Sequence, residues 1–391
     1  MTAPEAEAPA VTRAPKRADV VIIGAGVIGL SLALELAYRG VETVVLDRGL
    51  PGDRATSALG SAAGMINPQA HPGIEPEPVR DLALLSRHLY ADWIASIEEE
   101  SGILCEYDVR GGLTVARTDV EEVQLDRALD WQRSRGLAFE VLTADEVKER
   151  EPALDGEVRA AFSFPLEGQI ATARLGQALA LAARGAGAHV ISHAPVLAIR
   201  CESGRLVGVE SGAGLILAGA VVNAAGAWAA HVGGGGSAVP PIPIAPVRGQ
   251  MLRLDASADA DRLTRFAFAP GIYLVPRRDG SVVIGSTFER VGFDSRPTAG
   301  GIASLLQRAT SLVPAAADYP ILEAWGGLRP ASPDDIPIMG ETCLANYYLS
   351  IGHLKNGILL APASAVLMAD LLTQQSPPLP PAPFSPARFD L

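Results

Sequence analysis

Residues 19–48 constrain the fold of this chain more than any other segment. They read DVVIIGAGVIGLSLALELAYRGVETVVLDR, in which a strand-like apolar run leads through the glycine pattern GAGVIG into an apolar helical stretch, a second strand-like run and Asp47. A strand, a glycine-rich turn, a helix, a second strand and an acid about 20 residues past the glycines form a complete dinucleotide-binding unit. The sequence therefore predicts a Rossmann-like α/β unit that binds a dinucleotide, and it leaves the reaction open.

Each residue of this pattern has its own expected role. Gly24 permits the tight turn out of the first strand, Gly26 lets a pyrophosphate approach the backbone, and Gly29 lets the helix pack closely on the strand. The N–H groups and the positive end of the helix then face the phosphates. Asp47 is placed to accept hydrogen bonds from ribose hydroxyls and would repel an additional 2′-phosphate.

Length and composition narrow the class of protein further. A chain of 391 residues exceeds a typical single core, so two packed domains are expected. The net charge of −12 and the absence of any basic run longer than Arg277-Arg278 argue against a nucleic-acid partner. Apolar stretches are interrupted before the ~20 residues that a membrane span requires. The three cysteines and six histidines lack the spacing of metal ligands, which predicts no metal site. The three widely separated cysteines are expected to be reduced thiols in the cytoplasm.

Patterns of the dinucleotide fold return in two later parts of the chain. A helix-to-strand pattern follows Gln169 and leads to VVNAAGAW, and strand, Gly-rich turn and helix return over 343–373, whereas 240–320 carries alternating strands such as GQMLRL and IYLVPR. This order predicts a discontinuous cofactor domain with inserted segments that form a substrate domain. The expected divisions are a disordered leader over 1–17, a cofactor domain over 18–85, 155–235 and 322–373, a substrate domain over 86–154 and 236–321, and a Pro-rich tail over 374–391 that trails off the fold.

Seven motifs in a fixed order resemble the FAD-dependent D-amino-acid oxidase superfamily, and within it the glycine oxidases of thiamine biosynthesis. They are GAGVIGLSLALELA with the acid at position 47, SAAGMINP, VVNAAGAW, PVRGQML, IYLVPRRDGSVVIGSTFE, WGGLRPASPDDIPIMG and IGHLKNGILLAPASA, and they span residue 19 to about 373. The resemblance implies a discontinuous FAD-binding Rossmann-like domain with a second α+β substrate domain built on an antiparallel sheet.

The resemblance also implies which residues hold FAD. Asp47 takes the adenosine ribose, where the family usually carries Glu; the loop 62–65 lines the isoalloxazine ring; and the turn 352–358 aims backbone N–H groups at the flavin pyrimidine, where negative charge grows on reduction. No cysteine lies near GLRP, which implies non-covalent FAD. The implied cofactor-binding residues are Gly24, Gly26, Val27, Ile28, Gly29, Asp47, Arg48, Ser57, Ala62, Ala63, Gly64, Met65, Val196, Ala225, Gly226, Trp228, Gly352, His353, Leu354, Lys355, Asn356, Gly357 and Ile358.

Two residues match the family's contacts to a substrate carboxylate. Arg329 in GLRP matches the arginine that grips the carboxylate, and its planar fork of donors suits two parallel hydrogen bonds. From the residues alone, a structural pairing of Arg329 with Asp334 or Asp335 is the alternative. Tyr273 matches a tyrosine whose hydroxyl orients the same carboxylate, and its alternative is core packing.

Lys355 departs from the nearest pattern, because glycine oxidases commonly have Arg in this turn and sarcosine-type oxidases place a lysine close to it. Its ammonium is expected to contact substrate, to support the reduced flavin or its reaction with oxygen, or to be only a solvated turn residue. His353 in the same turn is expected to shape the turn rather than to catalyse.

The reaction implied is the FAD-dependent oxidative deamination of glycine or another small amino acid. Hydride passes from the α-carbon to flavin N5, the imine hydrolyses to an oxo acid, and oxygen yields hydrogen peroxide. The alternatives are a flavin dehydrogenase, a secondary-amine (sarcosine-type) oxidase of a specialised pathway, and a non-catalytic flavin subunit of a complex. The expected partners are a small amino-acid or amine substrate and oxygen, and the oligomeric state stays open.

Overall fold

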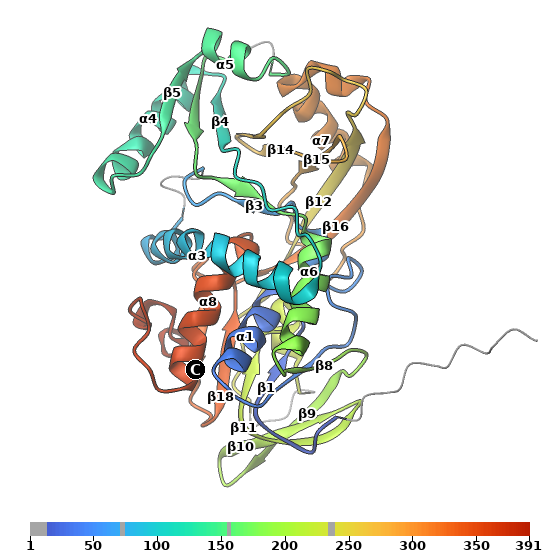
Figure 1. The fold of residues 1–391 in the computed structure, drawn as a ribbon, viewed down its shortest axis with the longest axis vertical. Helices are drawn as coiled ribbons and strands as arrows, with labels where there is room; N and C mark the ends of the chain where they lie inside the picture. Colours follow the sequence, from blue (N-terminus) through green and yellow to red (C-terminus); the bar gives the residue numbers. More distant parts are fainter. Residues whose placement is uncertain (1–13, 71–74, 155–157, 234–238) are drawn as a thin grey trace, which may run out of the picture.

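A computed structural model of the chain describes residues 14–70, 75–154, 158–233 and 239–391. The molecule is elongated, with a mainly parallel sheet and its helices in one half and a mainly antiparallel sheet in the other (Figure 1). Most of the expected leader, residues 1–13, lies outside the described residues. Among the residues described, no helix is both long and apolar enough to cross a membrane.

The first sheet is built around the predicted βαβ unit. Its first strand, β1 (Arg17–Ile23), pairs in parallel with β2 (Thr43–Leu46) on one side and with β11 (Gly214–Asn223) on the other. Val20 therefore lies opposite both Thr43 and Ala220. The order is β17-β18-β11-β1-β2-β8, with β9 and β10 attached to β11 as antiparallel strands. The bounds are β1 (Arg17–Ile23), β2 (Thr43–Leu46), β8 (His189–Ile191), β9 (Val196–Glu202), β10 (Arg205–Ser211), β11 (Gly214–Asn223), β17 (Ile338–Glu341) and β18 (Tyr347–Ile351).

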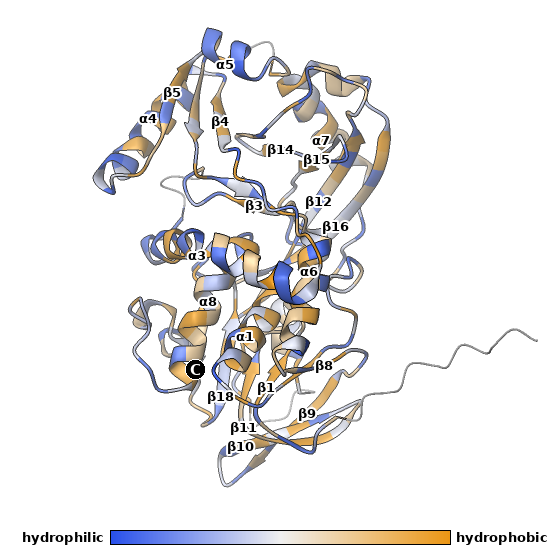
Figure 2. Cartoon of the chain, viewed as in Figure 1, coloured by the Kyte–Doolittle hydropathy of each residue, from blue (hydrophilic) through white to orange (hydrophobic). Residues whose placement is uncertain are grey.

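Four helices pack together beside this sheet, which three of them contact directly. They are α1 (Val27–Tyr38), α3 (Glu77–Ser101), α6 (Thr172–Gly185) and α8 (Gly357–Leu372). Helices α1 and α8 are predominantly hydrophobic along their length (Figure 2). An apolar surface all round a helix is typical of a helix buried between layers. Both helices accordingly contribute to one buried cluster that also contains residues of α3, α6 and the parallel strands.

The second sheet is mixed but mostly antiparallel, in the order β16-β12-β15-β14-β13-β4-β6-β5. Helix α7 packs on it, and two capping boxes start α4 and α5, with Thr118 and Thr143 as the N-cap residues. The bounds are β4 (Gly112–Ala116), α4 (Asp119–Ser134), β5 (Glu140–Thr143), α5 (Ala144–Arg150), β6 (Ala160–Phe164), β12 (Ala245–Asp255), β13 (Phe266–Ala269), β14 (Ile272–Pro276), β15 (Ser281–Gly285), α7 (Ala299–Leu312) and β16 (Ile321–Ala331). The predicted fold class is confirmed by this architecture and by the related structure described below.

Three elements lie on the other side of the predicted domain boundaries. The boundary predicted between residues 85 and 86 falls inside helix α3, whose buried side chains join the core of the parallel sheet. Strand β6 pairs with β4, and β16 pairs with β12, so both belong to the antiparallel sheet rather than to the cofactor domain. An apolar periodicity shows that a face is buried, but it does not show which of two cores buries it.

The Pro-rich tail also differs from the prediction, because it folds back onto the molecule. Two short helices, η3 (Ala382–Phe384) and η4 (Pro386–Phe389), bring Phe384 into the main core and place Leu391 against the sheet. Arg388 forms an ion pair with Asp334 at 2.8 Å. Proline disfavours regular structure, but a few apolar anchors and one ion pair suffice to dock an extended segment.

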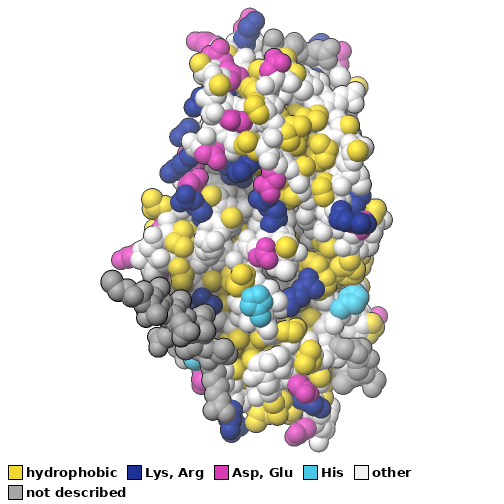
Figure 3. Space-filling model, turned by 90° about the vertical axis from the view of Figure 1, so that its right-hand side faces the viewer, with side chains coloured by type: hydrophobic (Ala, Val, Ile, Leu, Met, Phe, Trp, Pro, Cys, Tyr) yellow, Lys and Arg dark blue, Asp and Glu magenta, His cyan; other side chains and the backbone are white. Residues whose placement is uncertain are grey.

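Three short structural elements contribute residues to the cavity that is described below. They are α2 (Ala58–Ser61), the two-stranded ribbon of β3 (Met65–Ile66) with β7 (Gly168–Gln169), and η1 (Gly226–His231); a further turn, η2 (Pro314–Ala317), follows α7. On the face shown in Figure 3, Lys and Arg side chains of the described residues are scattered among acidic and hydrophobic ones rather than gathered in a basic patch.

Candidate active site

A cavity of about 530 Å³ extends from the carboxyl ends of the parallel strands to the antiparallel sheet. Its lining includes Gly24 after β1, Asp47 after β2 and Ala225 after β11, together with Tyr273 and Arg329 of the antiparallel sheet. Ligands of parallel α/β sheets bind at this end of the strands. The residues predicted for the site line the cavity except for Gly29 and Gly352, which pack behind its wall.

The three glycines of the first turn lie in different surroundings. A Cβ on Gly24 would stand 2.6 Å from the carbonyl oxygen of Ala224, and one on Gly29 would stand 2.0 Å from that of Gly24. A Cβ on Gly26 would meet nothing within 4 Å, because this residue faces the cavity. The first and third glycines are therefore required by packing, whereas the second leaves space for a ligand.

The carboxylate of Asp47 holds this turn in place. Its Oδ2 accepts from the N–H of Ala25 at 2.6 Å, and its Oδ1 accepts from the N–H of Gly49 at 2.7 Å. Each carboxylate oxygen has a further lone pair, so these bonds leave capacity for a ribose hydroxyl. Next to it, the guanidinium of Arg48 lies over the ring of Trp228, 3.9 Å from the ring centroid.

Asn223 organises the turn that follows β11, a role that the sequence reasoning missed. Its side-chain N–H₂ donates to the carbonyl oxygen of Ala229 and to the hydroxyl of Tyr347, both at 2.9 Å, and its Oδ1 accepts from the N–H of Ala225 at 3.1 Å. The side chain is fully buried. A polar residue at the end of an apolar strand was the available signal.

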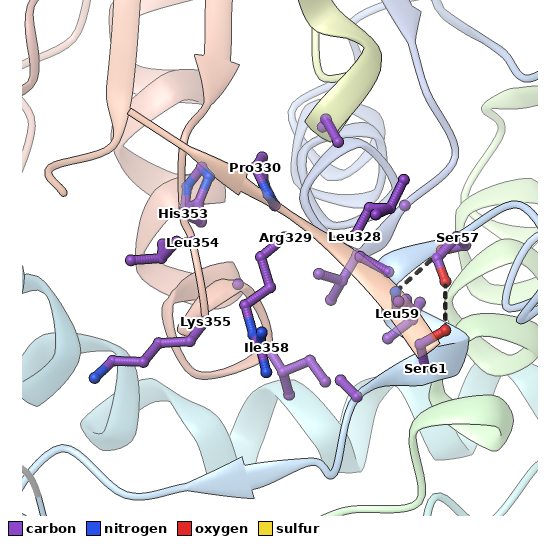
Figure 4. A pocket seen from close by; sticks show the side chains of 18 of the residues that line it. Ser57, Leu59, Ser61, Leu328, Arg329, Pro330, His353, Leu354, Lys355 and Ile358 are labelled. Carbon is purple, nitrogen blue, oxygen red and sulfur yellow. Dashed lines mark hydrogen bonds between the residues drawn. The ribbon is translucent and has the colours of Figure 1, made fainter. Parts of the chain in front are cut away.

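The small-residue loop is held from both sides. Ser57 caps α2 by accepting from the N–H of Leu59 at 3.1 Å, and Ser61 bonds back to it (Figure 4). Gly64 has a φ of +74°, and a Cβ there would stand 2.2 Å from the carbonyl oxygen of Ile170. The loop therefore requires glycine at this position both for its backbone conformation and for its close packing.

Arg277, which the sequence analysis did not assign to the site, holds the same loop. Its guanidinium donates to the carbonyl oxygen of Ala63 and, at 3.2 Å, to that of Ile170. Burial lowers the pKa of Arg277 to about 10, so the group stays cationic at neutral pH. A fixed positive charge therefore lies directly behind the loop that lines the cavity.

The turn before α8 supplies the opposite wall. Gly352 has a φ of +79°, and the N–H of Leu354 donates to the carbonyl oxygen of Pro330 at 3.0 Å. His353 is buried with its Nε2 3.1 Å from Ser364 Oγ, and burial lowers its pKa to about 3. His353 is thus neutral near pH 7. The N-terminus of α8 opens onto the cavity beyond it.

Arg329 projects from β16 into the cavity (Figure 4). Its Nη1 donates to the carbonyl oxygen of Thr287 at 3.1 Å and its Nη2 to Ser286 Oγ at 2.5 Å, while Phe288 lies beside it with the ring centroid 5.8 Å from Cζ. Among the residues described, no carboxylate forms an ion pair with it, and Asp334 pairs with Arg388 instead. The alternative of a structural pairing of Arg329 with Asp334 or Asp335 is therefore wrong.

Tyr273 lies in the wall between the two sheets. Its hydroxyl donates to Met251 Sδ at 3.2 Å, and its ring lies so close to Gly285 that a Cβ there would stand 2.4 Å from the hydroxyl oxygen. The side chain is half-buried, packs against the neighbouring core and also lines the cavity. Tyr273 therefore packs against the core and is also accessible to a ligand in the cavity.

The side chain of Lys355 leaves its turn in a different direction from that of Arg329 (Figure 4). Its Nζ forms an ion pair with Glu75 Oε1 at 2.8 Å, and the Glu75 side chain is only 13% exposed. The ammonium is therefore neither fully solvated nor unpaired. Among the described residues, no group of three or more His, Cys, Asp or Glu side chains is arranged to hold a metal ion.

A buried acid supports the segment that follows β3 at the cavity edge. Glu167 Oε1 accepts from the N–H of Gln69 at 2.7 Å, and Gln69 in turn bonds to Gln132 and Arg87. Burial raises the pKa of Glu167 to about 8. Glu167 is therefore protonated at neutral pH and becomes charged only at alkaline pH.

This raised pKa predicts that the protein loses stability as the pH rises. The contribution of the protonated acid is complete below the unfolded-state pKa of about 4.5 and is lost as the pH rises through 8. Glu167→Gln should lessen the fall in the free energy of unfolding between pH 5 and pH 9 by on the order of 4 kcal/mol. Chemical denaturation at several pH values measures this, with the exposed Glu99→Gln as control. An unchanged pH dependence in Glu167→Gln would contradict the prediction.

Comparison with known proteins assigns the chain to a family. The sequence model described as FAD dependent oxidoreductase (DAO) matches residues 19–371. The bifunctional protein ThiO/ThiG of Trichormus variabilis is 38% identical over 360 residues, which are 91% of this chain and 53% of that protein. The chain thus spans about half the length of this relative. The glycine oxidase of Geobacillus kaustophilus is 35% identical over 374 residues, 95% of this chain and 97% of that enzyme.

The crystal structure of glycine oxidase from Geobacillus kaustophilus has the same fold. It superposes with a TM-score of 0.87 at 33% identity and covers 95% of this chain and 98% of its own. The shared fold thus extends over nearly the whole of both chains. The chain belongs to the FAD dependent oxidoreductase (DAO) family.

Proposed function

We propose that the protein binds FAD non-covalently in the cavity and oxidatively deaminates glycine or another small amino acid. One observation carries the substrate class. The guanidinium of Arg329 reaches the cavity, and its hydrogen-bond partners are the neutral oxygens of Ser286 and Thr287. A positioned cation that no carboxylate of the described residues neutralises suits a substrate carboxylate. The names of the glycine oxidase relatives support the same substrate class.

The residues around the cavity fit FAD. The space in front of Gly26 lies at the N-terminus of α1, where backbone N–H groups and the helix dipole favour a pyrophosphate. The N-terminus of α8 and the loop held by Arg277 would face the flavin ring system. The three cysteines, all within the described residues, are absent from the cavity lining, which supports non-covalent attachment.

The chain's own residues would bind and orient the substrate. Arg329 would hold the carboxylate, Tyr273 would set its angle through the hydroxyl, and the short side chains of the loop 62–65 would leave little room for a large substrate side chain. Bound FAD would supply the hydride acceptor for the substrate α C–H and, on reaction with oxygen, the route to hydrogen peroxide. Orientation and electrostatics are thus the contributions proposed for the protein.

An anaerobic flavin-reduction screen tests this proposal. Purified protein is mixed without air with glycine, sarcosine and D- and L-amino acids, and the flavin absorbance is followed. We expect glycine or a small amino acid to bleach the flavin, and acid precipitation to leave the polypeptide colourless with FAD in solution. Bleaching by none of these compounds would contradict the proposed activity, and colour retained by the polypeptide would contradict non-covalent binding.

The same preparation decides the electron acceptor. We propose oxygen as the electron acceptor and the cytoplasm as the location of the protein. The oligomeric state is not assigned. Rapid reoxidation of the reduced flavin by air with formation of hydrogen peroxide supports an oxidase. Reoxidation by a quinone but not by air would instead identify a dehydrogenase.

Lys355 is proposed to act at the cavity wall through its pair with Glu75. Lys355→Met leaves the mostly buried Glu75 carboxylate without its partner, so we expect a lower melting temperature and slower flavin reduction, whereas Lys355→Arg should retain the pair and most of the rate. Stopped-flow measurement of both half-reactions checks this. Slowed reoxidation alone would assign the ammonium to the oxygen reaction, and normal rates in both half-reactions would remove Lys355 from the site.

A further inference from the structure

The segment that follows β15 supplies both hydrogen-bond acceptors of Arg329. Ser286 contributes its hydroxyl and Thr287 its carbonyl oxygen. The direction of the Arg329 fork therefore depends on where this segment lies. A carboxylate clamp requires that direction to be set before the substrate arrives, because a misplacement of about 1 Å can cost a hundredfold in rate.

An ion pair between a buried arginine and a partly exposed glutamate fixes the same segment to β12. The side chain of Arg248 is 7% exposed and forms an ion pair with Glu289, to which its Nε donates at 3.1 Å. The backbones of the two residues also exchange hydrogen bonds, at 2.8 and 3.0 Å. Nη1 of Arg248 in addition donates to the carbonyl oxygen of Arg296 at 3.0 Å. The guanidinium of Arg248 in β12 thus bonds to both ends of the loop 289–296.

Gln250 completes the attachment two residues along β12. Its N–H donates to Thr287 Oγ1 at 2.9 Å, its side-chain N–H₂ to Glu289 Oε1 at 2.7 Å, and its Oε1 accepts from the N–H of Thr298 at 2.7 Å. Successive residues of a strand face opposite sides. Gly249, between Arg248 and Gln250, accordingly lies on the cavity side, where a Cβ would stand 2.3 Å from the guanidinium nitrogens of Arg329.

Both faces of β12 therefore support the position of the Arg329 guanidinium. On the cavity side, Gly249 leaves room for the Arg329 fork, and on the opposite side Arg248 and Gln250 grip Glu289. Glu289 carries no contact to the cavity, since it is absent from the lining residues. Its carboxylate thus acts on the cavity indirectly, through Gln250 and the backbone of residues 286–289.

We propose that Arg248 and Glu289 are positioning residues for recognition of the substrate carboxylate, because their ion pair sets the backbone that orients Arg329. The inference rests on the proposed function of Arg329. It predicts that loss of the pair weakens carboxylate binding while the FAD cradle, which lies at the ends of the parallel strands, stays intact.

Acetate, a carboxylate without the reactive amine, is the probe. Its Kd is measured by titration of the flavin absorbance of the FAD-loaded protein, together with KM and kcat for the amine that reduces the flavin. Glu289→Ala should raise the acetate Kd and KM by about 10- to 100-fold with a smaller change in kcat. Glu289→Gln, which keeps the shape and one acceptor oxygen, should fall between Glu289→Ala and wild type.

Glu210→Ala is the control, because it removes an exposed pair between β9 and β10 whose two residues do not line the cavity. The two variants should have FAD contents close to each other, whereas Glu289→Ala should have the lower melting temperature, because it removes a carboxylate partner of the buried Arg248. Equal acetate Kd values in wild type and Glu289→Ala, or a Glu289→Ala loss explained by lost FAD, would overturn the positioning role alone. A wild-type protein that binds FAD but no acetate would overturn both this inference and the proposed role of Arg329.

Discussion

Replacing Arg329 by leucine is expected to raise the substrate KM by two orders of magnitude or more while leaving FAD content near wild type. Removal of one partner of a buried charge pair costs about 3–5 kcal/mol, which corresponds to such a change in affinity. Arg329→Lys should recover only part of it, because an ammonium lacks the planar fork that binds both carboxylate oxygens. Steady-state kinetics with the amine found in the anaerobic screen measures the effect.

The control for Arg329 is Arg290→Leu, which removes an exposed arginine of the segment that follows β15. Its KM should stay within about twofold of wild type, since surface substitutions change free energies by about 0.5 kcal/mol or less. Should Arg329→Leu fail to fold, or lose FAD in step with activity, the guanidinium would be a structural rather than a substrate-binding group.

Gly26→Ala is expected to weaken FAD binding by about 10- to 100-fold without destabilising the apoprotein. Its new Cβ points into open space at the N-terminus of α1, where the pyrophosphate is proposed to lie. Loss of one charge-assisted hydrogen bond to that group costs about 1.5–3 kcal/mol, which matches the predicted range. Fluorescence titration of apoprotein with FAD, and the melting temperature without FAD, separate binding from stability.

Two further alanine variants serve as contrasts. Gly29→Ala places its Cβ 2.0 Å from the carbonyl oxygen of Gly24, so it should lower the free energy of unfolding of the apoprotein by about 1–3 kcal/mol. Gly300→Ala, in α7 with nothing within 4 Å of the new Cβ, should change neither property for the worse. An FAD affinity of Gly26→Ala equal to wild type would contradict the proposed placement of the phosphates.

The βαβ unit of residues 19–48 could be predicted because its determinants are local. Strand and helix periodicity, the spacing of three glycines and an acid about 20 residues later are all read along a short stretch of chain. The structure supplies the geometric reasons, since a side chain on Gly24 or Gly29 would collide with a backbone carbonyl. The order of the later motifs likewise identified the family and its FAD dependence, which the family match confirms.

The sequence by itself thus determined the parallel unit, the presence of an antiparallel second sheet and part of the set of residues that line the cavity. Only the tertiary structure decided that α3 joins the core of the parallel sheet, that the Pro-rich tail docks through Phe384, and that Lys355 pairs with Glu75. It alone also revealed the Arg248–Glu289 pair behind Arg329. Local patterns record which face of an element is buried. The partner of a charged or apolar side chain is selected by segments that lie tens to hundreds of residues away, and that choice becomes visible only when the sheets are assembled.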